Sequence, residues 1–119
     1  MDLSVFQNAR LTGGFTLLRV ETSREPFTDA IGRPALAKTS IIGRRFEITV
    51  AEGLDDRELS VTLYHEVLEA ANVAADPAPD SVLELNEQDF DHIAYDMHDR
   101  LGAATPLNLN RMLEMFHFH

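Results

Sequence analysis

The order of the predicted elements, with strands in the first half of the chain and helices in the second, most limits how this sequence can fold. Residues 46–50 alternate apolar and polar side chains, as a half-buried strand does. Further along, Leu59, Leu63 and Val67 recur at helical spacing. Strands followed by helices are typical of an α+β fold. We therefore predict a small, mostly antiparallel N-terminal sheet packed against helices.

The predicted elements are bounded by residues that interrupt regular structure. Residues 27–34 are predicted to form a loop or short turn, and Gly43-Arg44 to form the turn of a hairpin. Asp55 or Asp56 is predicted to cap the first helix, because an aspartate side chain accepts from the free N–H groups at a helix start. The predicted strands cover residues 15–22, 37–42 and 45–51, and the predicted helices cover residues 57–74, 86–101 and 108–115.

Composition excludes several classes of protein. The chain has 119 residues and a mass of 13.3 kDa, which suits one domain covering residues 1–119. It contains no cysteine, which excludes a disulfide scaffold, a thiolate metal site and a cysteine nucleophile. No apolar run approaches the roughly 18 residues that span a bilayer. The first eight residues lack the basic and apolar regions of a signal peptide, so we expect a cytoplasmic protein.

The charge is unevenly distributed. The whole chain carries a net charge of −10, which argues against nucleic acid or an anionic membrane as the main partner. Residues 1–50 have a net charge of +2, whereas residues 51–119 have three arginines, fifteen acidic residues and a net charge of −12. Two interpretations are open at this point. The carboxylates form a solvated face that keeps the protein soluble, or some of them hold a cation.

The first predicted helix carries a group of residues that could bind a metal ion. His65 and Glu69 are four residues apart, so both side chains lie on one face of a helix and can reach one ion. Glu66 lies about 100° further round, where a carboxylate can act on a water molecule beside that ion. This is the H-E-x-x-H pattern of zinc peptidases with glutamate in place of the second histidine. A plain polar helix face would show the same pattern, so a second element must supply a further ligand.

The second predicted helix offers that ligand. Glu87 and Asp91 lie along one border of its apolar stripe, where side chains can face a cleft between two packed helices. From that border both can approach the face that carries His65 and Glu69. His98 is too far along the helix from Glu87 to share an ion with it.

Together these segments resemble the minimal zincin fold of metallopeptidases, in its gluzincin form. The resemblance rests on the strand at residues 46–50, the helix bearing His65-Glu66-x-x-Glu69, and the following helix with Asn86-Glu87 and Asp91 in the N-E-x-x-x-D pattern. Small zincin-like proteins of phage and bacteria with an H-E-x-x-E helix are also similar. The resemblance covers roughly residues 37–101.

The resemblance implies a metal-dependent hydrolase, zincin-like and peptidase-like, that acts on a peptide or protein. It makes His65, Glu69 and Glu87 the metal ligands. It makes Glu66 the general base acting on a metal-activated water, and Asp91 the residue that orients His65. Zinc accepts carboxylate oxygen as a ligand, and manganese or iron is the alternative because the site is rich in oxygen.

Two other interpretations remain. Two carboxylate ligands make the metal a poorer Lewis acid than two imidazoles and one carboxylate do, so the domain could be a catalytically degenerate zincin-like binding or regulatory module. Alternatively, the chain is an acidic adaptor that pairs with a basic partner protein through residues 76–99. The degenerate module is expected with or without metal, and a chelator lowers its melting temperature only where an ion is bound in the native state. The adaptor is expected to associate with its partner in a strongly salt-dependent way.

Overall fold

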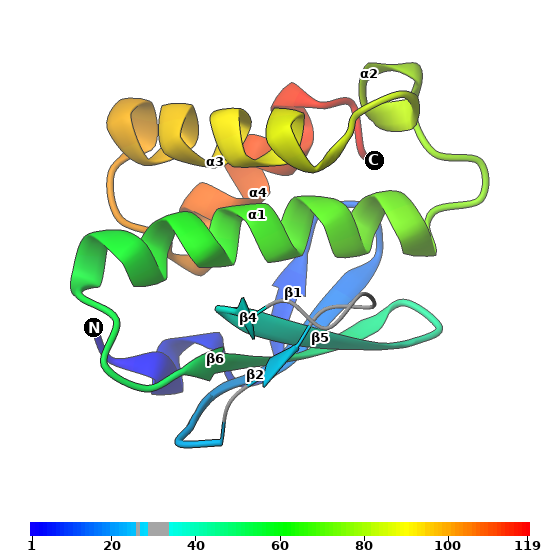
Figure 1. Cartoon of the computed structure of the whole chain (residues 1–119). Coiled ribbons are helices and arrows are strands. Elements are labelled where there is room, and N and C mark those ends of the chain that lie inside the picture. Colours follow the sequence, from blue (N-terminus) through cyan, green and yellow to red (C-terminus); the bar gives the residue numbers. More distant parts are fainter. Residues whose placement is uncertain (26, 29–33) are drawn as a thin grey trace.

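The computed structural model describes residues 1–25, 27–28 and 34–119. The fold is α+β, as the order of the sequence elements predicted, with strands in the first half of the chain and the main helices in the second. Figure 1 shows the long helix α1 (Asp56–Ala74) lying across the sheet and α3 (Glu87–Leu101) lying beyond it. Helix α1 is therefore the middle of three layers, with strands on one side and α3 on the other.

The main sheet has the strand order β1-β2-β6-β5. Strand β6 (Arg45–Ala51) pairs antiparallel with β5 (Ala37–Ile42) through the predicted hairpin at Gly43, and parallel with β2 (Phe15–Ser23). Strand β1 (Ala9–Leu11) pairs antiparallel with β2. The sheet is thus mostly antiparallel, as expected. Strand β1 and the central parallel pair were not predicted, because the sequence pattern shows which residues extend but not which strands meet.

The segment predicted as a loop at residues 27–34 contains two short strands at its ends. Strand β3 (Phe27–Thr28) pairs antiparallel with β4 (Pro34–Ala35), so the prediction of a loop or short turn is wrong at residues 27–28 and 34. Residues 29–33 lie outside the described part of the chain. The N-terminus also holds a short 3-10 helix, η1 (Leu3–Phe6), which packs beside β2 and buries Phe6.

The helices begin at residues that cap them with a side chain. Asp55, Asn86 and Thr105 each accept a hydrogen bond from a backbone N–H in the first turn of α1, α3 and α4 (Pro106–Met115) respectively. The N-cap of α1 is therefore Asp55 rather than Asp56. Helix α4 begins two residues earlier than predicted, because proline fits the first turn of a helix. The single turn α2 (Asp80–Leu83) was not predicted.

Helix α1 is buried on two sides, which a simple amphipathic helix is not. Leu63 and Val67, on the predicted apolar stripe, are fully buried. Thr62, on the predicted polar face, is only 8% exposed, and His65 is half-buried beside it. The reason is α3, which packs along this face. The second element that the metal-site interpretation requires is therefore present.

A buried serine connects α1 to α3 and to the chain that follows it. The hydroxyl of Ser60 lies 2.7 Å from Nδ1 of His98 and accepts a hydrogen bond from the backbone N–H of Ala104 at 2.8 Å. The Ser60 side chain is fully buried. His98 thus contacts Ser60 and not the predicted metal ligands, as its spacing from Glu87 along the helix indicated.

We expect Ser60→Ala to lower the free energy of unfolding by about 1–3 kcal/mol, because it leaves His98 and the buried N–H of Ala104 without their partner. Urea denaturation measures this. Ser40→Ala is the control: Ser40 is exposed on β5, and its loss is expected to change the free energy of unfolding by less than about 0.5 kcal/mol. Equal effects of the two substitutions would contradict the proposed role of Ser60.

Candidate metal centre

His65 lies between α1 and α3 with both ring nitrogens in contact with carboxylates. Its Nε2 is 2.9 Å from Oε2 of Glu69, one helical turn further along α1. The same nitrogen is 3.2 Å from Oε2 of Glu87, the first residue of α3. Nδ1 is 2.7 Å from Oδ1 of Asp91, one turn further along α3. The imidazole is therefore enclosed by acids from both helices, and its side chain is only 12% exposed.

The three residues predicted as ligands come together in space. One ligand atom from each of His65, Glu69 and Glu87 lies within 4.8 Å of the other two. The N-cap at Asn86 sets the start of α3, so that Glu87 projects from the first turn of that helix toward α1. Asp91 contacts the opposite nitrogen of His65 and leaves Nε2 facing the two glutamates. One imidazole nitrogen and two carboxylates at this spacing match a donor set that zinc, manganese or iron accepts.

The charges of the cluster also suit a cation. Burial works to lower the pKa of His65, but its hydrogen bonds with Glu69 and Asp91 and the nearby carboxylate charges raise that pKa from 6.5 to about 9. The hydrogen bond with His65 lowers the pKa of Glu69. Partial burial and the neighbouring Glu69 carboxyl raise the pKa of Glu87. Two adjacent carboxylates repel each other, and a bound divalent ion relieves that repulsion, so the residues fit a metal.

Glu66 lies beside this cluster and faces the sheet as well as the cleft. The hydroxyl of Thr39, in the edge strand β5, donates a hydrogen bond of 2.7 Å to Oε2 of Glu66. Burial raises the pKa of Glu66, and the Thr39 hydrogen bond acts in the opposite direction. A half-buried carboxylate with a raised pKa is suited to accept a proton near neutral pH.

The sequence interpretation did not identify Thr39. A signal for it exists in the alternation along β5, where Ala37 and Thr39 are half-buried and Lys38 and Ser40 are exposed. That alternation places the Thr39 side chain on the covered face of the strand. It does not say which residue of α1 lies opposite.

A cavity of about 420 Å³ opens beside the cluster, between the strand segment that leads into β5 and the two helices. His65 and Glu66 are in its wall, together with two of the acids of α3. Its lining consists of Ala35, Leu36, Ala37, Glu58, Val61, Thr62, His65, Glu66, Glu87, Asp91 and Tyr95. The predicted base and two of the three predicted ligands, His65 and Glu87, therefore share one cleft.

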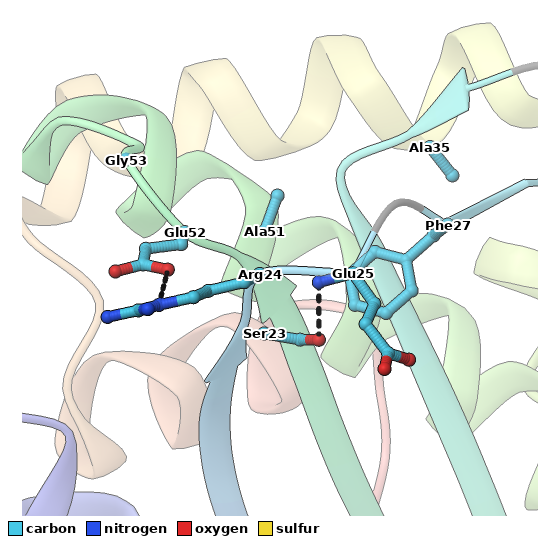
Figure 2. Close-up of a pocket in the computed structure, with 8 residues that line it drawn as sticks. All are labelled: Ser23, Arg24, Glu25, Phe27, Ala35, Ala51, Glu52 and Gly53. Atoms are coloured by element: carbon cyan, nitrogen blue, oxygen red, sulfur yellow. Dashed lines mark hydrogen bonds and ion pairs between the residues drawn. The ribbon is translucent and has the colours of Figure 1, made fainter.

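A second pocket, of about 400 Å³, lies at the ends of β2 and β6 and is drawn in Figure 2. Two of its three charged residues pair with each other: Nε of Arg24 is 3.1 Å from Oε2 of Glu52. The remaining polar contact in the picture is the hydroxyl of Ser23, which accepts from the backbone N–H of Glu25 at 3.1 Å. None of the described residues that line this pocket is a histidine. The chemistry of the metal centre therefore has no counterpart there.

The two histidines of α3 lie away from the metal centre. His92 is exposed on the outer face of α3, and His98 contacts Ser60.

Comparison with protein-family models, with curated proteins and with solved structures finds no match to this chain. No helix among the described residues combines the length and the apolar character needed to cross a membrane. The function must therefore be argued from the geometry of the site itself.

Proposed function

We propose that the protein is a metal-dependent hydrolase with a zincin-like site, which cleaves peptide bonds in the cytoplasm. The observation that carries the proposal is the contact of His65 with carboxylates from two helices, within reach of Glu66 in the same cleft. His65, Glu69 and Glu87 hold the metal, which is zinc, or alternatively manganese or iron. A divalent ion bound there supplies a Lewis acid that polarises the carbonyl group of the substrate.

The side chains of the chain itself carry the proton and fix the geometry. Asp91 accepts the Nδ1 hydrogen of His65, so that Nε2 is the nitrogen that would bind the ion, in place of the proton it shares with Glu69 in the metal-free chain. Glu66 takes a proton from the attacking water and delivers it to the leaving amine. Thr39 holds one carboxylate oxygen of Glu66, so that the base keeps one orientation during both transfers.

The position of β5 supports a peptide as substrate. Strand β5 is the last strand of the described sheet, and its partner β6 occupies one side of it. An extended peptide can add to a free strand edge through backbone hydrogen bonds. Thr39 connects this strand directly to Glu66, which supports a peptide bond being presented close to the base.

The carboxylate-rich donor set supports a second candidate function. Two carboxylates cancel the charge of a divalent ion, which weakens its action as a Lewis acid. A domain that binds metal and a peptide without cleaving it is the expected result if this effect dominates. The two candidates share the site and differ in turnover.

Metal content tests the proposal. Protein purified without a histidine tag, and measured by elemental mass spectrometry, is expected to contain close to one zinc, manganese or iron ion per chain. The double variant His65→Ala/Glu69→Ala is expected to contain none, because it removes two of the three ligands. His92→Ala removes an exposed histidine outside the cluster and is expected to retain the metal. Absence of metal from the unmodified protein, or equal metal in the double variant, would contradict the proposal.

A further inference from the structure

The two edges of the main sheet differ in what covers them. At the β1 edge, the side chain of Asn110 accepts a hydrogen bond from the backbone N–H of Thr12 at 2.8 Å and donates to the carbonyl of Arg10 at 3.3 Å. At the β5 edge, none of the described segments pairs with the outer side of the strand. Lys38 and residues 40–42 are exposed there. The β5 edge is therefore the one that can accept another strand.

The hydrogen bonds of the hairpin show which backbone groups of β5 face that edge. The N–H of Ala51 donates to the carbonyl of Leu36 at 2.8 Å. Such bonded positions alternate in an antiparallel pair, so the next positions of the register that bond to β6 are Lys38, Ser40 and Ile42. The N–H and C=O groups that point away from β6 belong to the residues between them, Ala37, Thr39 and Ile41. A second strand pairs with these groups.

The side chains along this edge are complementary to a second copy of the same strand. In an antiparallel pair of β5 strands centred on Thr39, Leu36 lies opposite Ile42 of the partner subunit. Ala37 likewise lies opposite Ile41 of the partner subunit. Leu36 and Ile42 are apolar, yet they are 54% and 52% exposed in the single chain. Pairing in this register sets each of them against the other on both sides of the axis, which removes apolar surface from water.

The charges on the outer face of the sheet fit the same register. Lys38 of the partner subunit then lies opposite Ser40, whose neighbour on β6 is Glu47. Arg19 forms ion pairs with Glu47 at 3.1 Å and with Glu21 at 3.3 Å, so one arginine serves two carboxylates. The lysine of the second copy, about 10 Å from Glu47 across two strand spacings, supplies another positive charge. A pair centred on Lys38 would instead place two lysines opposite each other, which is destabilising.

We propose that two copies of this chain associate through β5 about a twofold axis at Thr39, which joins their sheets into one continuous sheet. Ile41 of the partner subunit then lies beside Ala37, a residue in the wall of the cleft. A peptide that adds to β5 competes with the second copy for the same backbone groups. That competition rests on the proposed function, whereas the association itself does not.

Sedimentation equilibrium and amide hydrogen exchange of the full chain, over micromolar to millimolar concentrations, test this. We expect the mass to double as the concentration rises, and the amides of Thr39 and Ile41 to exchange at least about tenfold more slowly in the dimer. Ile42→Lys places a charge opposite Leu36 and is expected to weaken association at least about tenfold. The control is Leu107→Lys, which replaces an exposed apolar residue on α4 and is expected to preserve association.

The outcomes separate this inference from the proposed hydrolase. A chain that stays monomeric throughout that range overturns the dimer. A dimer in which the Thr39 and Ile41 amides exchange as fast as in the monomer also overturns it, because that dimer uses another surface. Association of Ile42→Lys at the strength of the unmodified chain does the same. None of these measurements depends on metal or turnover, so failure of the dimer leaves the hydrolase standing, and absence of metal leaves the dimer standing.

Discussion

Replacing Glu66 by glutamine is expected to lower the rate of peptide hydrolysis by about 10²- to 10⁴-fold and to leave the metal content unchanged. Glutamine has nearly the same shape as glutamate and keeps an oxygen that can accept the hydrogen bond from Thr39. It has no basic carboxylate, so it cannot take a proton from water. Because Glu66 is not one of the three ligands, the ion remains bound.

The measurement combines kcat on a cleaved library peptide with elemental mass spectrometry of the same sample. Glu84→Gln is a matched control, because Glu84 is an exposed glutamate outside the lining of the cleft. It is expected to retain both activity and metal. Hydrolysis at an unchanged rate in Glu66→Gln excludes Glu66 as the base. Loss of metal in that variant shows that Glu66 supports the ligands instead.

The metal-free protein is expected to lose about 3 kcal/mol of its free energy of unfolding as the pH rises from 6.5 to 10. The pKa of His65 is about 9 in the folded chain and 6.5 as the ordinary value, and each pKa unit corresponds to about 1.4 kcal/mol. A pKa raised by folding means that the protonated ring prefers the folded state. The stabilisation is therefore complete below pH 6.5 and is lost as the pH rises through 9.

Four carboxylates stand around the ring: Glu66 and Glu69 on α1, and Glu87 and Asp91 on α3. Burial opposes the shift, and the hydrogen bonds with Glu69 and Asp91 and the charges of Glu66 and Glu69 raise the pKa of His65. Urea denaturation at several pH values, with EDTA present, measures the loss. The control is His65→Ala, in which this part of the pH dependence is expected to be absent. Equal pH dependence of the two proteins between pH 6.5 and 10 would contradict the assignment of the raised pKa to His65.

Much of the secondary structure could be predicted because its signals are local. The alternation of residues 46–50 identifies β6, and the glycine at position 43 identifies the turn before it. Asp55 and Asn86 mark helix starts because they cap the N–H groups of the turn that follows them. The sequence did not predict the shortest elements, because a strand of three residues or a single helical turn has too little periodicity to be detected.

The candidate site could be predicted only where its residues share an element. His65 and Glu69 are brought together by helical geometry alone, since residues four apart share a face. The sequence likewise put Glu87 and Asp91 on one border of their helix. It left open whether that border meets His65, and Thr39 was not identified at all because it belongs to a strand on the other side of α1.

The sequence by itself thus determined the α+β order of the elements and, to within one residue, the starts of α1 and α3. It also placed His65 with Glu69 on one helix face, and Glu87 with Asp91 on one border of the next helix. Only the tertiary structure decided that α3 covers the polar face of α1, that β2 and β6 run parallel, and that Thr39 contacts Glu66. The physical reason is the range of the interactions. Periodicity and capping involve neighbours within a few residues, whereas the packing of helices and strands depends on how buried surfaces from distant segments fit together.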